Sequence, residues 1–345
     1  MKPLFTGCAT ALITPIRNGQ VDEPALHRLL DFQLDSGIDA IVACGTTGEP
    51  AAMTAEQWES TLSLIVNHVH RRVPVIAGTG GNNTADVIRK AARAKEIGAD
   101  AQLCVTPYYN KTTQAGLIAH YQAIARSNTL PLIVYNVPSR TNLNMLPATL
   151  AVIAKEDNVI GMKEASGNMA QILDMIRLCG DDIAFYSGSD EITAPMRAVG
   201  GAGTISVLSN IAPAVMRDMT HGSLEQAVAL NLKYLPLINA LFSEVNPIPV
   251  KAAEAMMGLC ENELWLPLVP MSEAKEQKLK EEMQKVGLIC RRFYCPVRAG
   301  GWAVRWRTWL RMNRRRSFAA WMCMRSSGAT SLFIPPSPWW RRKRM

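Results

Sequence analysis

The sequence has few features of a membrane-bound, metal-binding or secreted protein. No apolar run approaches the ~20 residues of a membrane span, and no signal peptide is recognisable. The cysteines form no CxxC pair, and the histidines do not cluster, because His68 and His70 are two residues apart and point to different faces of a helix. We therefore expect a reduced, cytoplasmic protein without a bound metal or a membrane partner.

Acidic residues are missing from one part of the chain only. The formal charge is +8, but residues 290–345 hold fourteen Arg or Lys and no Asp or Glu. The preceding 289 residues therefore carry 23 basic against 29 acidic side chains, a net charge of about −6. The basic charge is confined to residues 290–345, so it does not predict a nucleic-acid partner for the body of the chain.

Residues 290–345 also hold six of the eight tryptophans. One interpretation is a basic, aromatic arm that binds nucleic acid or anionic lipid. The other is an extension without selected structure, such as the product of a shifted reading frame, which we favour because no helical or strand period persists there. We expect this tail to be unstructured and the protein to bind neither nucleic acid nor membrane.

Eight apolar runs rich in strand-forming residues recur along the first 223 residues. They cover residues 8–15, 40–48, 74–80, 101–109, 131–138, 159–166, 183–190 and 203–210. Segments with helical spacing separate them, and near-continuous apolar strands that alternate with helices predict a parallel sheet covered on its faces. Eight such units favour a closed (β/α)₈ TIM barrel over an open sheet.

The pattern changes at about residue 224. Three helical segments follow, at residues 224–242, 247–259 and 272–288. We therefore predict three parts: a barrel over residues 1–223, a small C-terminal helical domain over 224–289, and the tail over 290–345.

Polar residues collect where the predicted strands end, which is the face of a TIM barrel that carries the chemistry. The second run ends in Gly-Thr-Thr-Gly-Glu at 45–49, and the fifth ends in Tyr-Asn-Val-Pro-Ser-Arg at 135–140. Lys163 lies inside the sixth run, between residues typical of a strand buried on both faces.

Lys163 has two interpretations. It is either a structural charge or a nucleophile, because burial disfavours an ammonium and can release a free amine near neutral pH. Such an amine attacks ketones to form a Schiff base. Glu164 is not expected to pair with it, because adjacent strand residues point to opposite faces.

The other strand ends favour the nucleophile. Thr46 and Thr47 offer hydroxyl and backbone N–H groups for the carboxylate of a keto acid. Tyr135 and Tyr109 offer hydroxyls that could move protons. A lone tyrosine, however, more often packs its ring against apolar neighbours and exposes its hydroxyl to solvent.

Together these motifs resemble the dihydrodipicolinate synthase family, also called 4-hydroxy-tetrahydrodipicolinate synthase. The similar stretches are "GTTGE" at 45–49, "TPYYN" at 106–110, "YNVPSRT" at 135–141 and "GMKEASG" at 161–167. They occur in consistent order, and the resemblance extends from about residue 4 to residue 288. It implies a pyruvate-dependent class I aldolase of the N-acetylneuraminate lyase superfamily, which condenses pyruvate with L-aspartate 4-semialdehyde for lysine and diaminopimelate biosynthesis.

The resemblance also implies roles for single residues. Lys163 would form the Schiff base, with Tyr135 as acid and base. Thr46 and Tyr109 would complete the proton relay, and Tyr109 would reach in from a neighbouring subunit of a homotetramer, a dimer of dimers. Thr47 and Ile205 would bind pyruvate. No cofactor is expected, because the lysine itself supplies the electron sink.

Arg140 separates this family from its relatives. A guanidinium can hold a carboxylate through two parallel hydrogen bonds, and the semialdehyde carries one. The related N-acetylneuraminate lyases generally lack "PSRT" and have a serine at the first threonine of "GTTGE". The alternatives are a pyruvate aldolase or lyase acting on another aldehyde and, less favoured, a nucleic-acid or membrane-binding protein that acts through its tail.

Feedback inhibition by lysine is expected to be weak. The resemblance places Ala55 and Trp58 where many inhibited members have histidines. Asn82, Asp86 and Tyr108 still resemble parts of that inhibitory site.

Overall fold

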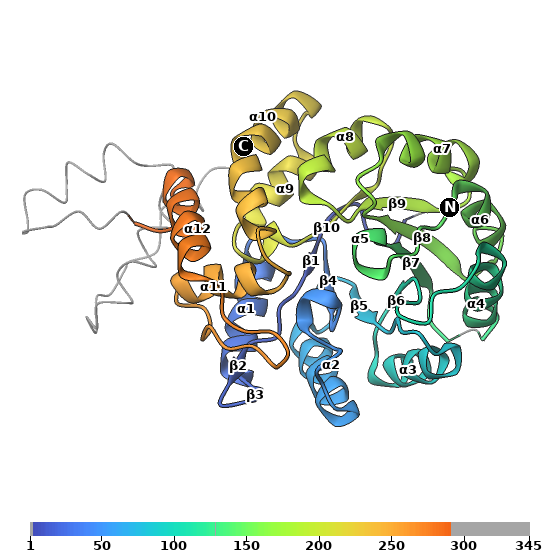
Figure 1. Cartoon of the computed structure of the whole chain (residues 1–345), viewed down its shortest axis with the longest axis horizontal. Helices are drawn as coiled ribbons and strands as arrows, with labels where there is room; N and C mark the ends of the chain where they lie inside the picture. Colours follow the sequence, from blue (N-terminus) through green and yellow to red (C-terminus); the bar gives the residue numbers. More distant parts are fainter. Residues whose placement is uncertain (1–2, 128, 291–345) are drawn as a thin grey trace, which may run out of the picture. The chain divides into compact units, whose positions relative to one another are not determined.

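Eight parallel strands close into a barrel in the computed structural model, which describes residues 3–127 and 129–290. The barrel strands are β1 (Gly7–Ala11), β4 (Ala40–Ala43), β5 (Val75–Gly78), β6 (Ala101–Val105), β7 (Leu132–Asn136), β8 (Val159–Glu164), β9 (Ala184–Ser187) and β10 (Gly203–Ser206). Strands β4 to β10 pair in sequence order, and β1 pairs with both β10 and β4 (Figure 1). Seven of the predicted apolar runs contain one of these strands in full, and the first overlaps β1, which begins one residue earlier, at Gly7.

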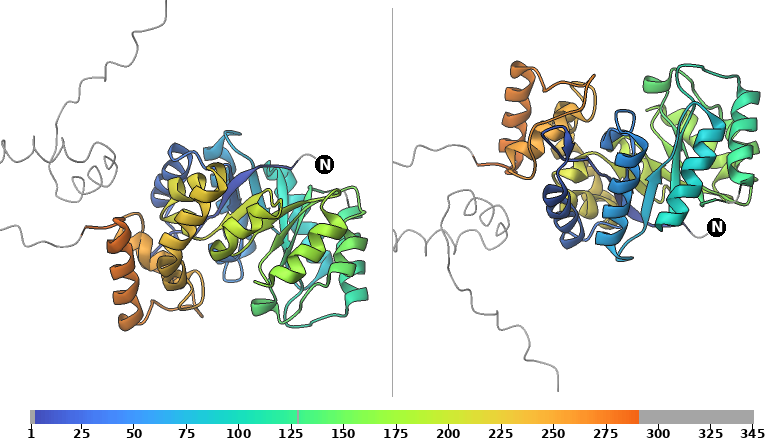
Figure 2. Two further views of the ribbon diagram at one scale, coloured as in Figure 1. Left: turned by 90° about the horizontal axis from the view of Figure 1, so that it is seen from above. Right: turned by 90° about the horizontal axis from the view of Figure 1, so that it is seen from below.

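Helices surround the barrel, which confirms the predicted TIM fold (Figure 2). They are α1 (Glu23–Asp35), α2 (Ala55–Val69), α3 (Thr84–Ile97), α4 (Gln114–Arg126), α5 (Pro138–Thr141), α6 (Pro147–Ile153), α7 (Met169–Cys179), α8 (Thr193–Ala198) and α9 (Pro213–His221). Three single turns of 3₁₀ helix, η1 (Thr46–Gly48), η2 (Asp190–Ile192) and η3 (Leu208–Asn210), follow strands β4, β9 and β10. The sequence analysis did not predict these turns or the small hairpin of β2 (Ile16–Arg17) and β3 (Gln20–Val21).

Several helices begin at a residue whose side chain accepts a hydrogen bond from the first helical turn. This N-cap satisfies an N–H group that the helix itself leaves without a partner. The capping residues are Asp22, Thr54, Asn83, Thr113, Asn168 and Ser223. Short polar residues at these positions therefore fix where the chain turns from the barrel into a helix.

The strands are mostly apolar because both of their faces are buried. Side chains such as Val42, Leu103 and Ile133 fill the barrel interior. Residues next to them in sequence, such as Cys104 and Val134, point outward and pack under the helices. A strand covered on both sides reads as a continuous apolar run, which explains why the sequence located these strands.

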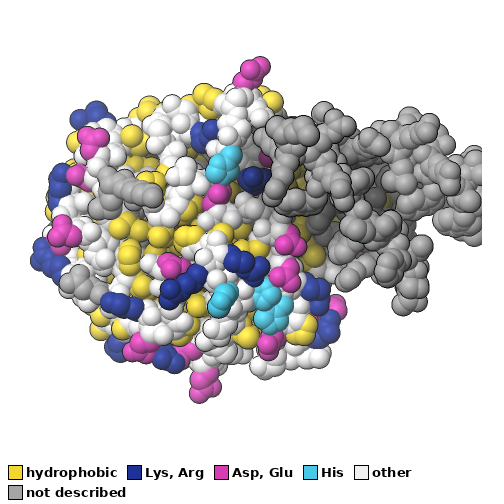
Figure 3. Space-filling model, turned by 180° about the vertical axis from the view of Figure 1, so that it is seen from behind, with side chains coloured by type: hydrophobic (Ala, Val, Ile, Leu, Met, Phe, Trp, Pro, Cys, Tyr) yellow, Lys and Arg dark blue, Asp and Glu magenta, His cyan; other side chains and the backbone are white. Residues whose placement is uncertain are grey.

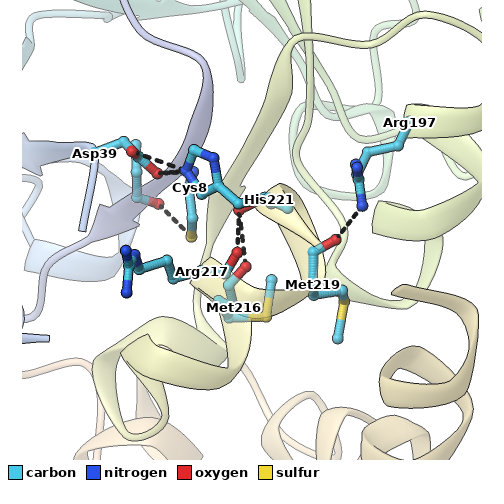
Figure 4. Close-up of polar contacts among 9 residues, drawn as sticks. Cys8, Asp39, Arg197, Met216, Arg217, Met219 and His221 are labelled. Atoms are coloured by element: carbon cyan, nitrogen blue, oxygen red, sulfur yellow. Dashed lines mark hydrogen bonds and ion pairs between the residues drawn. The ribbon is translucent and has the colours of Figure 1, made fainter. Parts of the chain in front are cut away.

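The barrel closes between β1 and β10 at two glycines. Gly7 is paired with Gly203, and a Cβ atom at position 203 would collide with the backbone oxygen of Gly7. Beside them, Asp39 accepts a hydrogen bond from the backbone N–H of Cys8 and lies 2.8 Å from Nε2 of His221 (Figure 4). Small residues at this end let the strands meet and leave room for the Asp39–His221 pair.

Cys8, Asp39 and His221 do not form a nucleophilic triad, although they lie together. The thiol of Cys8 donates to the backbone oxygen of Ala9, not to the imidazole. Burial raises the pKa of this thiol well above its usual value, so it stays protonated. The cluster is therefore a structural contact at the N-terminal end of β1.

Three further helices follow the barrel: α10 (Leu224–Leu241), α11 (Ile248–Met256) and α12 (Glu273–Val286). Each lies within one of the predicted helical segments. Chain contacts group Met1–Leu288 into one unit, so these helices and the barrel belong together (Figure 2). The separate domain at 224–289 remains a proposal, and the predicted tail falls outside the described residues apart from Cys290.

A buried ion pair connects α11 to the barrel. Nζ of Lys251 lies 2.5 Å from a carboxylate oxygen of Glu49, which follows η1, and both side chains are buried. The other oxygen of Glu49 accepts from the backbone N–H of Trp265. Two charges removed from water stabilise each other only when such hydrogen bonds are complete. Loss of either partner would leave the other as an uncompensated buried charge.

The surface of the described part of the chain shows mixed charge. On the face in Figure 3, basic and acidic side chains alternate. Among the described helices, none combines the length and the hydrophobicity that crossing a bilayer requires.

His120 provides a test of the barrel's acid stability. Its Nδ1 lies 2.9 Å from the hydroxyl of Thr84, and burial lowers its pKa to about 4. The unfolded chain, with a histidine pKa of about 6.5, takes up the proton first. Stability should therefore fall as pH drops from about 6.5 to about 4, by roughly 3 kcal/mol at most.

We expect His120→Asn to reduce this acid-induced loss, because asparagine stays neutral. Urea unfolding at pH 7.5, 6 and 5 measures the effect, with the exposed His70→Asn as the matched control. A pH dependence unchanged in His120→Asn would show that this histidine is not responsible.

Candidate active site

Lys163 lies on β8 between two tyrosines of the neighbouring strands. The parallel register pairs it with Tyr135 on β7 and with Tyr186 on β9. Its Nζ lies 4.3 Å from the centre of the Tyr135 ring. The lysine that the sequence singled out therefore points into the barrel next to a second predicted site residue.

The amine of Lys163 is buried without a carboxylate partner. Only 6% of the residue is exposed, and among the described residues its Nζ makes no hydrogen bond or ion pair. Burial lowers the pKa of Lys163 from 10.5 to about 7; the charge of Asp190 opposes this shift and that of Arg140 adds to it. A substantial fraction of the amine is thus unprotonated near neutral pH.

Glu164 faces away from Lys163, as the strand geometry predicts. Its two carboxylate oxygens accept from the backbone N–H of Ser166, at 2.7 Å, and from the side-chain amide of Asn136, at 3.0 Å. These bonds hold the chain where it leaves β8. Glu164 therefore supports the end of the strand and does not neutralise the lysine.

Tyr135 presents a protonated phenol to the same space. The residue is 7% exposed, and burial raises its pKa to about 12. Its hydroxyl makes no hydrogen bond with any described residue, so it remains open to a ligand. A phenol in this state can donate a proton to an adjacent oxygen.

Thr46 and Thr47 form the turn η1 immediately after β4. The turn is closed by a hydrogen bond of 2.8 Å from the N–H of Gly48 to the oxygen of Gly45. Thr46 is half-buried, whereas Thr47 is buried and its hydroxyl accepts from the side chain of Asn246 at 2.9 Å. A Cβ at position 48 would lie 3.2 Å from the oxygen of Leu12, which favours glycine there.

Arg140 lies on α5, which begins directly after β7. One of its terminal nitrogens donates to the backbone oxygen of Asn246 at 3.0 Å. The guanidinium is otherwise exposed, so its remaining N–H groups are open to a ligand.

Two adjoining cavities contain most of the predicted site. The first, of about 590 Å³, is lined by five predicted residues: Lys163, Tyr135, Thr46, Thr47 and Arg140. The second, of about 390 Å³, shares Thr46, Tyr135 and Arg140 with it. The structure therefore brings together residues from three strand ends around one opening.

Tyr109 and Ile205 line neither cavity. Tyr109 is 91% exposed, on the loop after β6, with a positive φ of 68°. Ile205 is buried in the barrel core opposite Ala9. Within one chain, these two residues do not join the other five.

The sequence analysis missed the contribution of the segment between α10 and α11. Phe242, Ser243, Glu244, Val245 and Asn246 all line the first cavity. No strand-end or motif signal marks them, because they approach the barrel only through the packing of the C-terminal helices.

The described residues contain no group of three or more His, Cys, Asp or Glu side chains placed to hold a metal ion. The arrangement instead offers a partly deprotonated amine, a phenol, a hydroxyl pair and a guanidinium around one space. This set can attack a ketone, move protons and hold carboxylates.

Comparison with known proteins gives a consistent result. The model of the dihydrodipicolinate synthetase family matches residues 4–286. The 4-hydroxy-tetrahydrodipicolinate synthase of Syntrophus aciditrophicus (strain SB) is 48% identical over 290 residues, which are 83% of this chain and 100% of that protein.

Solved structures agree. The dihydrodipicolinate synthase of Thermotoga maritima is 41% identical with a TM-score of 0.81, over 83% of this chain and 100% of that one. The chloride-inhibited dihydrodipicolinate synthase of Acinetobacter baumannii, complexed with pyruvate, is 40% identical with a TM-score of 0.81, over 82% and 99% of the two chains.

Gly188 tests whether space around Lys163 is essential. A Cβ atom at this position would lie 2.7 Å from Cβ of Ala165 and 3.0 Å from Cε of Lys163. We expect Gly188→Ala to displace the amine and reduce kcat/KM at least tenfold, since small misplacements of reacting groups are costly.

Steady-state kinetics and a thermal melt would check this. Gly81→Ala is the matched control, because its new Cβ would meet its nearest neighbour, Val87, at an ordinary 3.6 Å. Full activity of Gly188→Ala with an unchanged melting temperature would contradict the prediction.

Proposed function

The chain belongs to the dihydrodipicolinate synthetase family, and we propose that it acts through an imine between pyruvate and Nζ of Lys163. The reaction is the condensation of pyruvate with L-aspartate 4-semialdehyde to 4-hydroxy-tetrahydrodipicolinate, a lyase-class step of lysine and diaminopimelate biosynthesis. The observation that carries the proposal is the buried, unpaired amine of Lys163 in the cavity at the strand ends.

Imine formation begins when the free amine adds to the keto carbon of pyruvate. The resulting carbinolamine loses its hydroxyl as water after a proton is supplied, and the imine then loses a proton from the methyl carbon to give an enamine. We assign these transfers to the phenol of Tyr135, because it lies next to Lys163 and its raised pKa keeps the hydroxyl protonated near neutral pH.

The enamine carbon then attacks the aldehyde carbon of the second substrate, whose oxygen takes up a proton. Attack of that substrate's amino group on the imine carbon closes the ring and releases Lys163. No external oxidant or reductant is needed. We assign the carboxylate of pyruvate to Thr46 and Thr47, and that of the semialdehyde to Arg140, which borders the same cavity.

Tyr109 and Ile205 keep their proposed roles on the resemblance alone. The exposure of Tyr109 supports a role between subunits, because its hydroxyl can complete a relay with Thr46 only in another chain's site. This is our reason to propose a homotetramer. Ile205 would contact pyruvate from the barrel core, although its side chain lines neither cavity.

We also propose a cytoplasmic location and weak inhibition by lysine. Five of the described cysteines, Cys8, Cys44, Cys104, Cys179 and Cys260, form no disulfide, in keeping with a reducing compartment. Trp58 is buried, and its indole donates to the backbone oxygen of Gly78 at 3.2 Å. This packing supports a structural role for Trp58 instead of one in binding an effector.

The alternative functions have less support. A lyase for another aldehyde would share the lysine chemistry, but the relatives are synthases. A nucleic-acid or membrane-binding function would rest on residues 290–345, which lie outside the family match and, apart from Cys290, outside the described residues.

Borohydride reduction tests the imine directly. With pyruvate present, reduction should attach the keto acid irreversibly at Lys163, at a rate that rises through about pH 7 as the ammonium loses its proton. Peptide mass spectrometry would locate the adduct, which should be absent from Lys163→Ala.

Lys90 is the matched control for this test. Burial lowers its pKa too, and it lines the second cavity. If Lys163 is the reactive amine, Lys90→Gln should still be labelled at Lys163. An adduct at Lys90, or an active enzyme without any adduct, would refute the proposal.

Arg140 should separate the two substrates. We expect Arg140→Ala to form the pyruvate imine but to lose roughly tenfold to a hundredfold in kcat/KM for the semialdehyde, as one charge-assisted pair disappears. Arg140→Lys should recover only part of this loss. It restores the positive charge, but an ammonium lacks the planar, two-pronged geometry of a guanidinium.

Arg140→Ala should also change the pH dependence of imine trapping. The positive charge of Arg140 helps to lower the pKa of Lys163, so its removal should move the pH profile of imine trapping to higher pH. Poor trapping with normal use of the semialdehyde would instead place Arg140 in the pyruvate half of the site.

A further inference from the structure

Asn246 lies at the point where the two halves of the site meet. It belongs to the segment between α10 and α11, is 6% exposed, and lines both cavities. None of the motifs that suggested the site includes this residue.

The side chain of Asn246 contacts the pyruvate half. Its amide Nδ2 donates to the hydroxyl oxygen of Thr47 at 2.9 Å. A threonine hydroxyl has one hydrogen and two acceptor positions. Because it accepts from Asn246, its own hydrogen is left to donate, and a bound carboxylate in the first cavity needs donors.

The backbone of Asn246 contacts the other half. Its carbonyl oxygen accepts a hydrogen bond from the guanidinium of Arg140 at 3.0 Å. This bond fixes one edge of the guanidinium, to which we assigned the carboxylate of the semialdehyde. Five residues before Asn246, the chain is anchored by the end of α10. Five residues after it, Lys251 forms the buried ion pair with Glu49, next to the turn that carries Thr47.

The orientation of the Asn246 amide decides what Thr47 can do. In the structure Oδ1 is buried and has no hydrogen-bond partner among the described residues. If the amide were reversed, the hydroxyl of Thr47 would donate to Oδ1 and could only accept from a ligand. A ligand carboxylate, which only accepts, would then lose this contact.

We infer that Asn246 is a positioning residue: its amide makes the Thr47 hydroxyl a donor to the carboxylate of pyruvate, while its carbonyl orients Arg140. This inference rests on the proposed function and deepens it, because it adds the C-terminal segment to substrate selection. Asn246 would act on pyruvate through its side chain and on the semialdehyde through its backbone carbonyl.

Substitution at 246 separates the two contacts. Asn246→Asp cannot donate when ionised, takes the Thr47 hydrogen for itself and repels a carboxylate. We expect the pyruvate concentration for half-maximal imine trapping to rise tenfold or more. Asn246→Ala, which leaves the Thr47 hydrogen free, should raise it less, and KM for the semialdehyde should change little because the backbone carbonyl remains.

A pH signature distinguishes this role from simple disturbance of the fold. Protonation of the new carboxyl restores a donor. The pyruvate concentration for half-maximal trapping by Asn246→Asp should therefore fall toward the wild-type value as pH falls. Asn246→Ala should show no such recovery. In a Thr47→Val background, Asn246→Ala should add little further loss, because its effect passes through the missing hydroxyl.

The measurement is borohydride trapping over a range of pyruvate concentrations at several pH values, with kinetics on both substrates. Asn67→Asp, the same change at an exposed position of α2, is the control. If wild type traps pyruvate but Asn246→Asp binds it normally, or no worse than Asn246→Ala, the inference is overturned. If wild type traps nothing, the proposed function itself fails.

Discussion

The removal of one amine from water is the feature on which the candidate site depends. Lys163 lies in a barrel whose strand residues are mostly apolar, and its contacts are the ring of Tyr135 and a cavity instead of a carboxylate. An adjacent acid would have stabilised the ammonium and abolished its nucleophilicity. Strand geometry prevents this, because Glu164 points outward and is engaged by Asn136 and Ser166.

The site is assembled from distant parts of the chain. The barrel supplies Lys163 and Tyr135, whereas the segment after α10 supplies Asn246, and the Lys251–Glu49 pair attaches that segment to η1. Breaking this pair would leave an uncompensated buried charge, so its main effect is to fix the position of the turn. The lining of the candidate site therefore depends on helices that lie outside the (β/α)₈ repeat.

The sequence predicted the barrel because strands buried on both faces are apolar without interruption, as at Val159–Met162 in β8. It predicted five residues that share one cavity, because each lies at or just after a strand end. It could not predict Asn246, whose approach depends on tertiary packing between helices. Its assignments of Tyr109 and Ile205 rest on resemblance, since a single chain places neither beside the cavities.

The contact between Glu49 and Lys251 also orders events during synthesis. More than two hundred residues separate the partners, so Glu49 leaves the ribosome long before Lys251 does. Until then the carboxylate of Glu49 lacks its buried cation, and the turn with Thr47 lacks one of the contacts that hold it; the hydroxyl of Thr14, which donates to the oxygen of Gly48, is already present. Domains tend to fold from the N-terminus as they emerge. The cavity at the strand ends is therefore complete only when the last helices are present, and a chain that stops before residue 242 has Lys163 but lacks part of the cavity lining.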